Sequence, residues 1–212
     1  MKYERPVTPA DQSQELLDFC ASISPNLFPV YVDVQPLPGA TPDECFPLVK
    51  AYAEQWGGES VIGWSIWVFP GMFLEAEFHA VWRDAEGVLV DITPKRTPTD
   101  RILFLPDPTK SFVGVQVNNV RLATSASPVL CRYLQTFDEK FAIMNRGERL
   151  HQLGTIKLSM EEADRIIALE REAYELFLAL RGALVDIGPY SPCPCGSGRK
   201  VRWCHRSAAK AG

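Results

Sequence analysis

The chain has 212 residues, of which 46% are hydrophobic and 23% are charged, and its formal net charge is −4. This composition is enough for a buried core, excludes a disordered chain, and fits one domain of ordinary size with a small appendage. No apolar run approaches the roughly 18 residues that would span a bilayer, and residues 1–14 lack the apolar stretch of a signal peptide. We therefore expect a cytoplasmic protein that does not associate with membranes.

The first quarter of the sequence predicts a helix, a strand and a second helix. Residues 9–24 place apolar side chains at helical spacing, and residues 29–39 are typical of a short strand followed by Pro- and Gly-rich turns. In residues 43–58, apolar side chains recur at i, i+3, i+4 and i+7 before Gly57 and Gly58 end the pattern. This second helix therefore has one apolar face.

Three β-rich runs follow, at residues 63–69, 72–82 and 87–93, and turn sequences containing Gly or Pro separate them. Their short connections predict an antiparallel meander. Residues 127–144 then predict a helix, and a serine and a glutamate at capping-box spacing open a long amphipathic helix at residues 160–182. The fold class that we expect is α+β, with the meander packed against helices.

Three cysteines and a histidine gather in the stretch SPCPCGSGRKVRWCHR, residues 191–206. One residue separates the first two cysteines, so in extended backbone both thiols point to the same side. Gly196 and Gly198 permit a reversal that brings the remaining pair back to them. Three thiolates and one imidazole complete a closed tetrahedral site of the structural kind that zinc prefers. We expect one structural Zn²⁺ per chain, with the ligands Cys193, Cys195, Cys204 and His205.

The spacing C-x-C-x₈-C-H, with CPCGSG inside it, closely resembles the SEC-C motif found at the C-terminus of the preprotein-translocase ATPase SecA. The resemblance covers residues 192–206 and implies zinc binding together with contact to another macromolecule, which in SecA is the chaperone SecB or the ribosome. Val201 departs from the motif, which usually has an aromatic residue there, and Trp203 is the candidate for that packing role.

The expected organisation is a body at residues 1–185, a linker at 186–191, the zinc motif at 192–206 and a flexible tail at 207–212. Residues 190–212 carry five basic and no acidic side chains, which leaves a net charge of −9 on the rest of the chain. Such a tail suits a protein or ribonucleoprotein partner with an acidic surface, and nucleic acid is a further possibility. A solvated tail without a partner is the alternative.

The predicted hairpin of the body carries two candidate catalytic residues. Alternation along residues 72–82 places Glu77 and His79 on one face of the strand. If residues 85–87 form a three-residue loop that ends in a left-handed glycine, Asp91 becomes a diagonal neighbour of His79 on that face. A loop one residue longer or shorter would place the two on opposite faces. The sequence thus permits a His79–Asp91 pair, and Glu77 is the alternative partner.

Cys45 lies near the start of the helix at residues 43–58, where backbone dipoles and a nearby imidazolium would favour its thiolate form. The order of Cys on a helix, His on a strand and Asp on the next strand is similar to that of papain-like and transglutaminase-like cysteine hydrolases, over residues 43–94. By this resemblance Cys45 is the nucleophile, His79 the general base and acid, and Asp91 the carboxylate that orients the imidazole.

Two details of this arrangement are open. Pro47 predicts that the helix starts at residue 47, which would leave Cys45 just outside the first turn. The candidate oxyanion donors are the Cys45 backbone N–H and the Gln35 side-chain amide.

Two functions of different classes follow. The first is a cysteine hydrolase or acyltransferase that acts on an amide or thioester and docks through the zinc tail. The second is a non-catalytic adaptor that docks to a ribosome, a chaperone or nucleic acid through the zinc knuckle, in which case His79 is only a hydrogen-bonded histidine on a sheet. We expect Cys20 and Cys131 to be small buried hydrophobes. The sequence leaves the substrate and the oligomeric state open.

Overall fold

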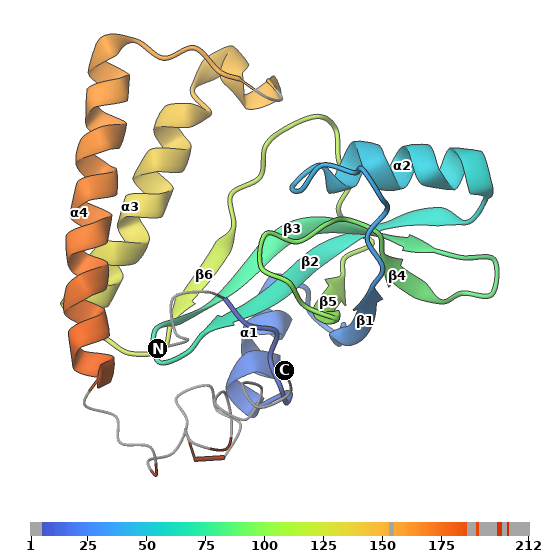
Figure 1. Ribbon diagram of the computed structural model, residues 1–212, viewed down its shortest axis with the longest axis horizontal. Helices are drawn as coiled ribbons and strands as arrows, with labels where there is room; N and C mark the ends of the chain where they lie inside the picture. Colours follow the sequence, from blue (N-terminus) through green and yellow to red (C-terminus); the bar gives the residue numbers. More distant parts are fainter. Residues whose placement is uncertain (1–5, 153–154, 186–189, 191–198, 201–202, 204–212) are drawn as a thin grey trace.

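The computed structural model describes residues 6–152 and 155–185, together with residues 190, 199–200 and 203. Within these residues the fold is α+β: two helices pack on a mixed six-stranded sheet, and a pair of long antiparallel helices stands at one end of it (Figure 1). The elements in chain order are α1 (Gln14–Ile23), β1 (Val30–Val34), α2 (Cys45–Trp56), β2 (Glu59–Phe69), β3 (Phe73–Arg83), β4 (Leu89–Asp91), β5 (Arg101–Pro106), β6 (Val120–Ala123), α3 (Pro128–Met144), a 3₁₀ turn (Gly147–His151) and α4 (Met160–Val185).

The antiparallel meander predicted from the sequence is confirmed, because β2 pairs with β3 and β3 pairs with β4. β1 lies parallel to β4, and β5 pairs antiparallel with both β1 and β2. The strands β1 to β5 therefore form a closed sheet, and β6 extends this sheet from one edge of β3.

The sequence pattern did not reveal β5 or β6. The four residues Ile102, Leu103, Phe104 and Leu105 of β5 are all fully buried, because Ile102 and Phe104 face one apolar cluster while Leu103 and Leu105 face another. A strand that is buried on both faces lacks the alternation by which strands are recognised in a sequence.

Helix α1 covers part of the sheet with the apolar face that its sequence predicts, and its buried residues are Leu16, Phe19 and Cys20. Ser13 caps its first turn by accepting a hydrogen bond from the Leu16 N–H. Burial raises the pKa of the Cys20 thiol to about 12, which agrees with the expected structural role.

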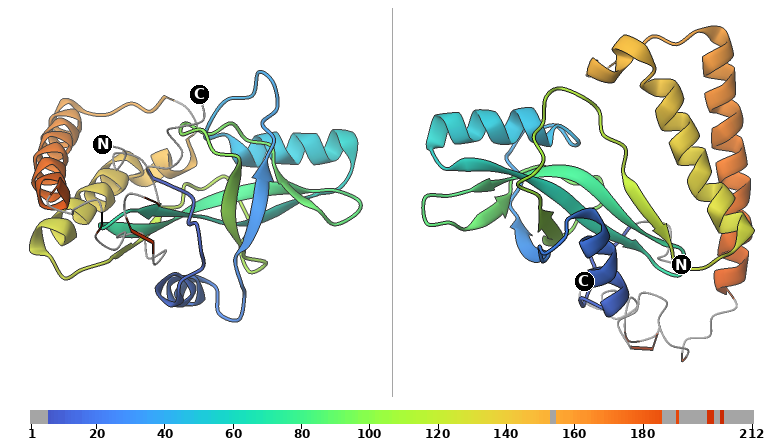
Figure 2. Two further views of the ribbon diagram at one scale, coloured as in Figure 1. Left: turned by 60° about the horizontal axis from the view of Figure 1, so that its bottom comes forward. Right: turned by 180° about the vertical axis from the view of Figure 1, so that it is seen from behind.

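Helices α3 and α4 lie side by side, as the views in Figure 2 agree. The predicted capping box is confirmed: Ser159 Oγ accepts from the Glu162 N–H at 3.1 Å, and Glu162 accepts from the Ser159 N–H at 3.1 Å. Leu130 and Leu134 on the inner face of α3 join a buried cluster with Phe73. The expectation that Cys131 is buried is wrong, because Cys131 lies one position beyond this face and is exposed.

No helix in the described part of the chain is both long and apolar enough to cross a bilayer.

Candidate functional site

The β3–β4 hairpin has the register that the three-residue loop predicts. Trp82 pairs with Val90, the Asp84 N–H donates to the Val88 carbonyl at 3.0 Å, and Gly87 has a φ of 87°. The left-handed conformation of Gly87 supplies the extra loop residue without strain. This register places His79 and Asp91 on the same face of the sheet.

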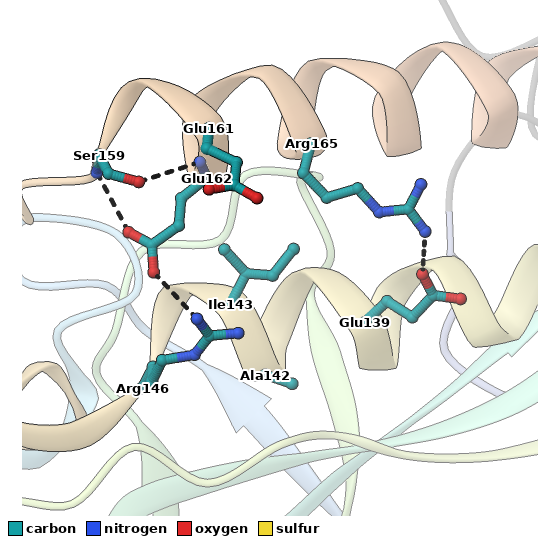
Figure 3. Close-up of a pocket in the computed structure, with 8 residues that line it drawn as sticks. All are labelled: Glu139, Ala142, Ile143, Arg146, Ser159, Glu161, Glu162 and Arg165. Atoms are coloured by element: carbon teal, nitrogen blue, oxygen red, sulfur yellow. Dashed lines mark hydrogen bonds and ion pairs between the residues drawn. The ribbon is translucent and has the colours of Figure 1, made fainter.

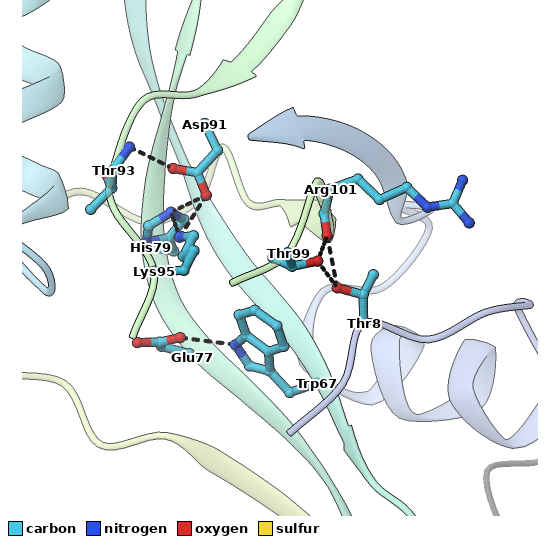
Figure 4. Close-up of polar contacts among 9 residues, drawn as sticks. All are labelled: Thr8, Trp67, Glu77, His79, Asp91, Thr93, Lys95, Thr99 and Arg101. Atoms are coloured by element: carbon cyan, nitrogen blue, oxygen red, sulfur yellow. Dashed lines mark hydrogen bonds and ion pairs between the residues drawn. The ribbon is translucent and has the colours of Figure 1, made fainter. Parts of the chain in front are cut away.

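His79 and Asp91 form a buried hydrogen-bonded pair (Figure 4). His79 Nε2 lies 3.0 Å from Asp91 Oδ2, and the two residues are 3% and 0% exposed. The Thr93 N–H donates to the other carboxylate oxygen, Oδ1, at 3.0 Å, which fixes the orientation of the carboxylate. Glu77 is not the partner of His79, because it accepts a hydrogen bond from the Trp67 indole at 2.9 Å.

Lys95 joins this pair, although no sequence pattern singles it out. Its Nζ lies 2.5 Å from Asp91 Oδ2 and 2.9 Å from His79 Nε2, and its side chain is only 11% exposed. The next residue, Arg96, forms an exposed ion pair with Asp43. Within the polar stretch TPKR, the sequence contains no signal that separates the inward lysine from the outward arginine.

Cys45 is the first residue of α2, so the expectation that the helix starts at Pro47 is wrong. Proline is tolerated in the first turn because N–H groups there have no intrahelical acceptor. Cys45 is 4% exposed and belongs to an apolar cluster with Val49, Ala80 and Ile92. Since side chains alternate along a strand, Ala80 points toward α2 while His79 leaves β3 on the other side.

An opening in the sheet lies at His79. On one edge of β3, residues 73–76 pair with β6 and residues 82–83 pair with β4. Between these two ranges, no strand in the described part of the chain pairs with this edge. Cys45 and His79 are coupled by charge across this region, although the described residues include no hydrogen bond between them.

The charges of the cluster set its protonation states. Burial and the charge of Lys95 lower the pKa of His79, but its charge coupling to Asp91 and Cys45 raises it, and the resulting pKa is about 9. Burial raises the pKa of Asp91, but His79 and Lys95 lower it further, to about 2. At neutral pH the pair therefore holds an imidazolium on His79 and a carboxylate on Asp91.

Gln35, a candidate oxyanion donor, directly follows β1. Its backbone N–H donates to the Asp91 carbonyl at 2.9 Å, and the residue is exposed. Thr93, beside the pair, is 1% exposed, and its Oγ1 has no hydrogen-bond partner among the described residues. The Thr93 hydroxyl is therefore available to form a hydrogen bond with a substrate or a water molecule that enters the site.

A pocket of about 420 Å³ lies elsewhere, between α3 and α4 (Figure 3). Four of its charged side chains form two ion pairs: Glu162 with Arg146 at 3.6 Å, and Arg165 with Glu139 at 2.6 Å. These groups join the two helices, so we assign the pocket no chemistry.

The four predicted zinc ligands, Cys193, Cys195, Cys204 and His205, lie outside the described residues. Within the described part of the chain, no group of three or more Cys, His, Asp or Glu side chains is arranged to hold a metal ion. Two aromatic residues in this region are described: Tyr190, just before the motif, and Trp203, within it, meet edge to face with ring centroids 5.8 Å apart.

No protein-family model, curated protein or solved structure matches this chain.

Proposed function

We propose that the protein is a cysteine hydrolase or acyltransferase that acts on an amide or thioester through Cys45, His79 and Asp91. The observation that carries this proposal is the buried His79–Asp91 hydrogen bond, whose imidazole is coupled by charge to a cysteine in the first turn of α2. A buried, oriented imidazole with a perturbed pKa beside a cysteine is typical of nucleophilic active sites.

The orientation of the imidazole supports this role. Asp91 engages Nε2 of His79, which leaves Nδ1 as the nitrogen for exchange of a proton with a thiol. Catalytic hydrogen bonds are often long in a free enzyme and tighten when the substrate binds. The proposal therefore requires Cys45 Sγ and His79 Nδ1 to approach at the opening in the edge of β3.

The reaction follows from these groups. The Cys45 thiolate attacks the acyl carbon, and the backbone N–H of Cys45 and the Gln35 side chain stabilise the oxyanion. The imidazolium of His79 gives its Nδ1 proton to the departing amine or thiol, which leaves a thioester on Cys45. Water or an acceptor amine then attacks the thioester, gives a proton to the neutral imidazole, and releases the thiolate.

The C-terminal cluster supports a second part of the proposal. Three thiolates and one imidazole are the donor set of a closed structural zinc site, so Cys193, Cys195, Cys204 and His205 would hold Zn²⁺ and fold the knuckle around it. The resemblance to the SEC-C motif favours docking to a protein or ribonucleoprotein through this basic segment.

One observation favours the alternative, a non-catalytic adaptor. Cys45 lies in an apolar cluster and makes no hydrogen bond to His79 within the described residues. In an adaptor His79, Asp91 and Lys95 would hold the sheet together, and the zinc knuckle would carry the function.

Labelling with iodoacetamide at about pH 6.5 separates the two functions, because only a thiolate reacts appreciably. If Cys45 is the nucleophile, it reacts faster than the exposed Cys131, and His79→Ala slows its labelling about tenfold or more by removing the imidazolium. His151→Ala, a change at an exposed histidine far from β3, is the matched control. If His79→Ala does not change the labelling rate of Cys45 in folded protein, the result contradicts the enzyme proposal and favours the adaptor.

A further inference from the structure

Lys95 and His79 converge on one oxygen atom. Asp91 Oδ1 is taken by the Thr93 N–H, so the Lys95 ammonium and the His79 ring both approach Oδ2, at 2.5 and 3.0 Å. Lys95 Nζ has only protons to donate, and it also lies 2.9 Å from His79 Nε2. When Nε2 is protonated, two positively charged donors therefore compete for one acceptor.

The other groups around the imidazole do not supply a second cation. Asp91 of β4 faces His79 directly, and Cys45 of α2 is coupled to it by charge from the other side of β3. Glu77 lies on the same face of β3 as His79, where it accepts a hydrogen bond from the Trp67 indole. Beside the imidazole, the described side chains that β1, β2 and β5 contribute to this face carry no charge, as at Val32, Ser65, Trp67, Ile102 and Phe104. At the start of β2, Glu59 lies on this face and is paired with Arg83 of β3.

We propose that Lys95 is a positioning residue, which competes with His79 for Asp91 and thereby keeps the imidazolium from being held too tightly to give up its proton. The catalytic meaning of this inference rests on the proposed function. Without Lys95, the carboxylate would bind the imidazolium alone, as in a simple buried ion pair.

The second half of the proposed reaction shows why this matters. Hydrolysis of the thioester needs a neutral imidazole, and each unit by which the pKa of His79 rises removes about nine-tenths of that form at neutral pH. Acylation of Cys45 removes the charge coupling by which Cys45 raises the pKa of His79, which leaves Asp91 and Lys95 with opposite effects on that pKa. Lys95 then lowers the pKa of His79 and so favours release of the imidazolium proton.

The test is an NMR titration of His79 in the full chain, which has three histidines, so that a His79→Ala spectrum assigns the signal. Lys95→Met should raise the titration midpoint of His79 by about one unit, because it removes a positive charge within hydrogen-bond distance. Lys95→Gln, which keeps a donor for Asp91, should raise it as well, and Lys95→Arg should leave it near the wild-type value. The Gln variant also serves if the Met variant does not fold.

An unchanged midpoint in folded Lys95→Met or Lys95→Gln overturns the inference, as does an equal rise in Lys95→Arg, because the effect would then not depend on charge. Failure of the proposed function is distinguishable. If His79→Ala does not change the labelling rate of Cys45 while the Lys95 variants change the titration midpoint of His79, the enzyme proposal fails. The effect of Lys95 on His79 then still stands.

Discussion

The Trp67 indole donates a hydrogen bond to Glu77 Oε2 across the face of the sheet on which His79 lies. This bond occupies the carboxylate nearest to His79 on its own strand, so Asp91 of the next strand becomes the partner of the histidine. The two carboxylates therefore have separate roles, although either one satisfies the sequence pattern.

The first prediction compares these two carboxylates. Asp91→Asn should slow the labelling of Cys45 and lower the free energy of unfolding by about 3 kcal/mol, because it leaves His79 and Lys95 without their buried anion. Glu77→Gln should leave the labelling rate nearly unchanged, since Glu77 is hydrogen-bonded to the Trp67 indole and takes no part in the bond between Nε2 and Oδ2. Chemical denaturation and labelling of the two variants check this, and equal effects on labelling would show that Asp91 has no special role.

The second prediction concerns stability and pH. The folded pKa of His79, about 9, lies above its ordinary value of 6.5, so its stabilisation is fully present below about pH 6.5 and is lost as the pH rises through 9. The folded pKa of Asp91 is lowered to about 2 from 3.8, so its contribution is present above about pH 4 and is lost as the pH falls through 2. The free energy of unfolding should thus be greatest between about pH 4 and 6.5.

Denaturation of the wild type and His79→Gln between pH 5 and 9 measures the histidine contribution. The wild type should lose stability on the order of 3 kcal/mol across this range relative to the variant. Cys20, whose pKa is raised by burial, is present in both proteins, so its contribution cancels in the comparison. Parallel curves for the two proteins would contradict the prediction.

The third prediction concerns access to Cys45. Its neighbour Phe46 stacks on Phe112 of the β5–β6 connection, with ring centroids 4.1 Å apart and an interplanar angle of 8°. Such a stack contributes about 1 kcal/mol, so Phe112→Ala should increase the open population and speed the labelling of Cys45 roughly fivefold. The matched control is Phe69→Ala, which removes a similar stack on Phe73 at the opposite end of the β2–β3 hairpin. Equal acceleration by both variants would indicate general loosening of the fold.

The fourth prediction concerns the metal. Purified protein should contain about one zinc per chain, and Cys193→Ser, Cys204→Ser or His205→Ala should lower that content, because each removes one of four ligands. The circular dichroism of the body should not change if residues 186–191 are the linker that the sequence predicts. Cys131→Ser is the control for loss of a cysteine outside the motif. Unchanged zinc content in all three ligand variants would remove the metal hypothesis.

The sequence predicts the β3–β4 part of the site well because its geometry is local. Gly87 and the loop length set the register, and the register brings His79 to Asp91. The same reasoning cannot find Lys95, which enters the cluster from an irregular segment after β4, where no periodicity indicates its direction. It also cannot specify the approach of Cys45 to His79, because that depends on how α2 packs on the sheet.

The pairing of β5 has a consequence for folding. β2, β3 and β4 are joined by short turns, so they can pair early, whereas β5 must insert between β2 and β1, which lie far from it in the sequence. Gly63 on β2 allows β5 to approach closely, because a Cβ at this position would lie 2.2 Å from the Leu105 carbonyl oxygen. Because the closure of long loops is slow, we expect the insertion of β5 to limit the rate of folding and the hairpin that carries His79 and Asp91 to form before the sheet closes around it.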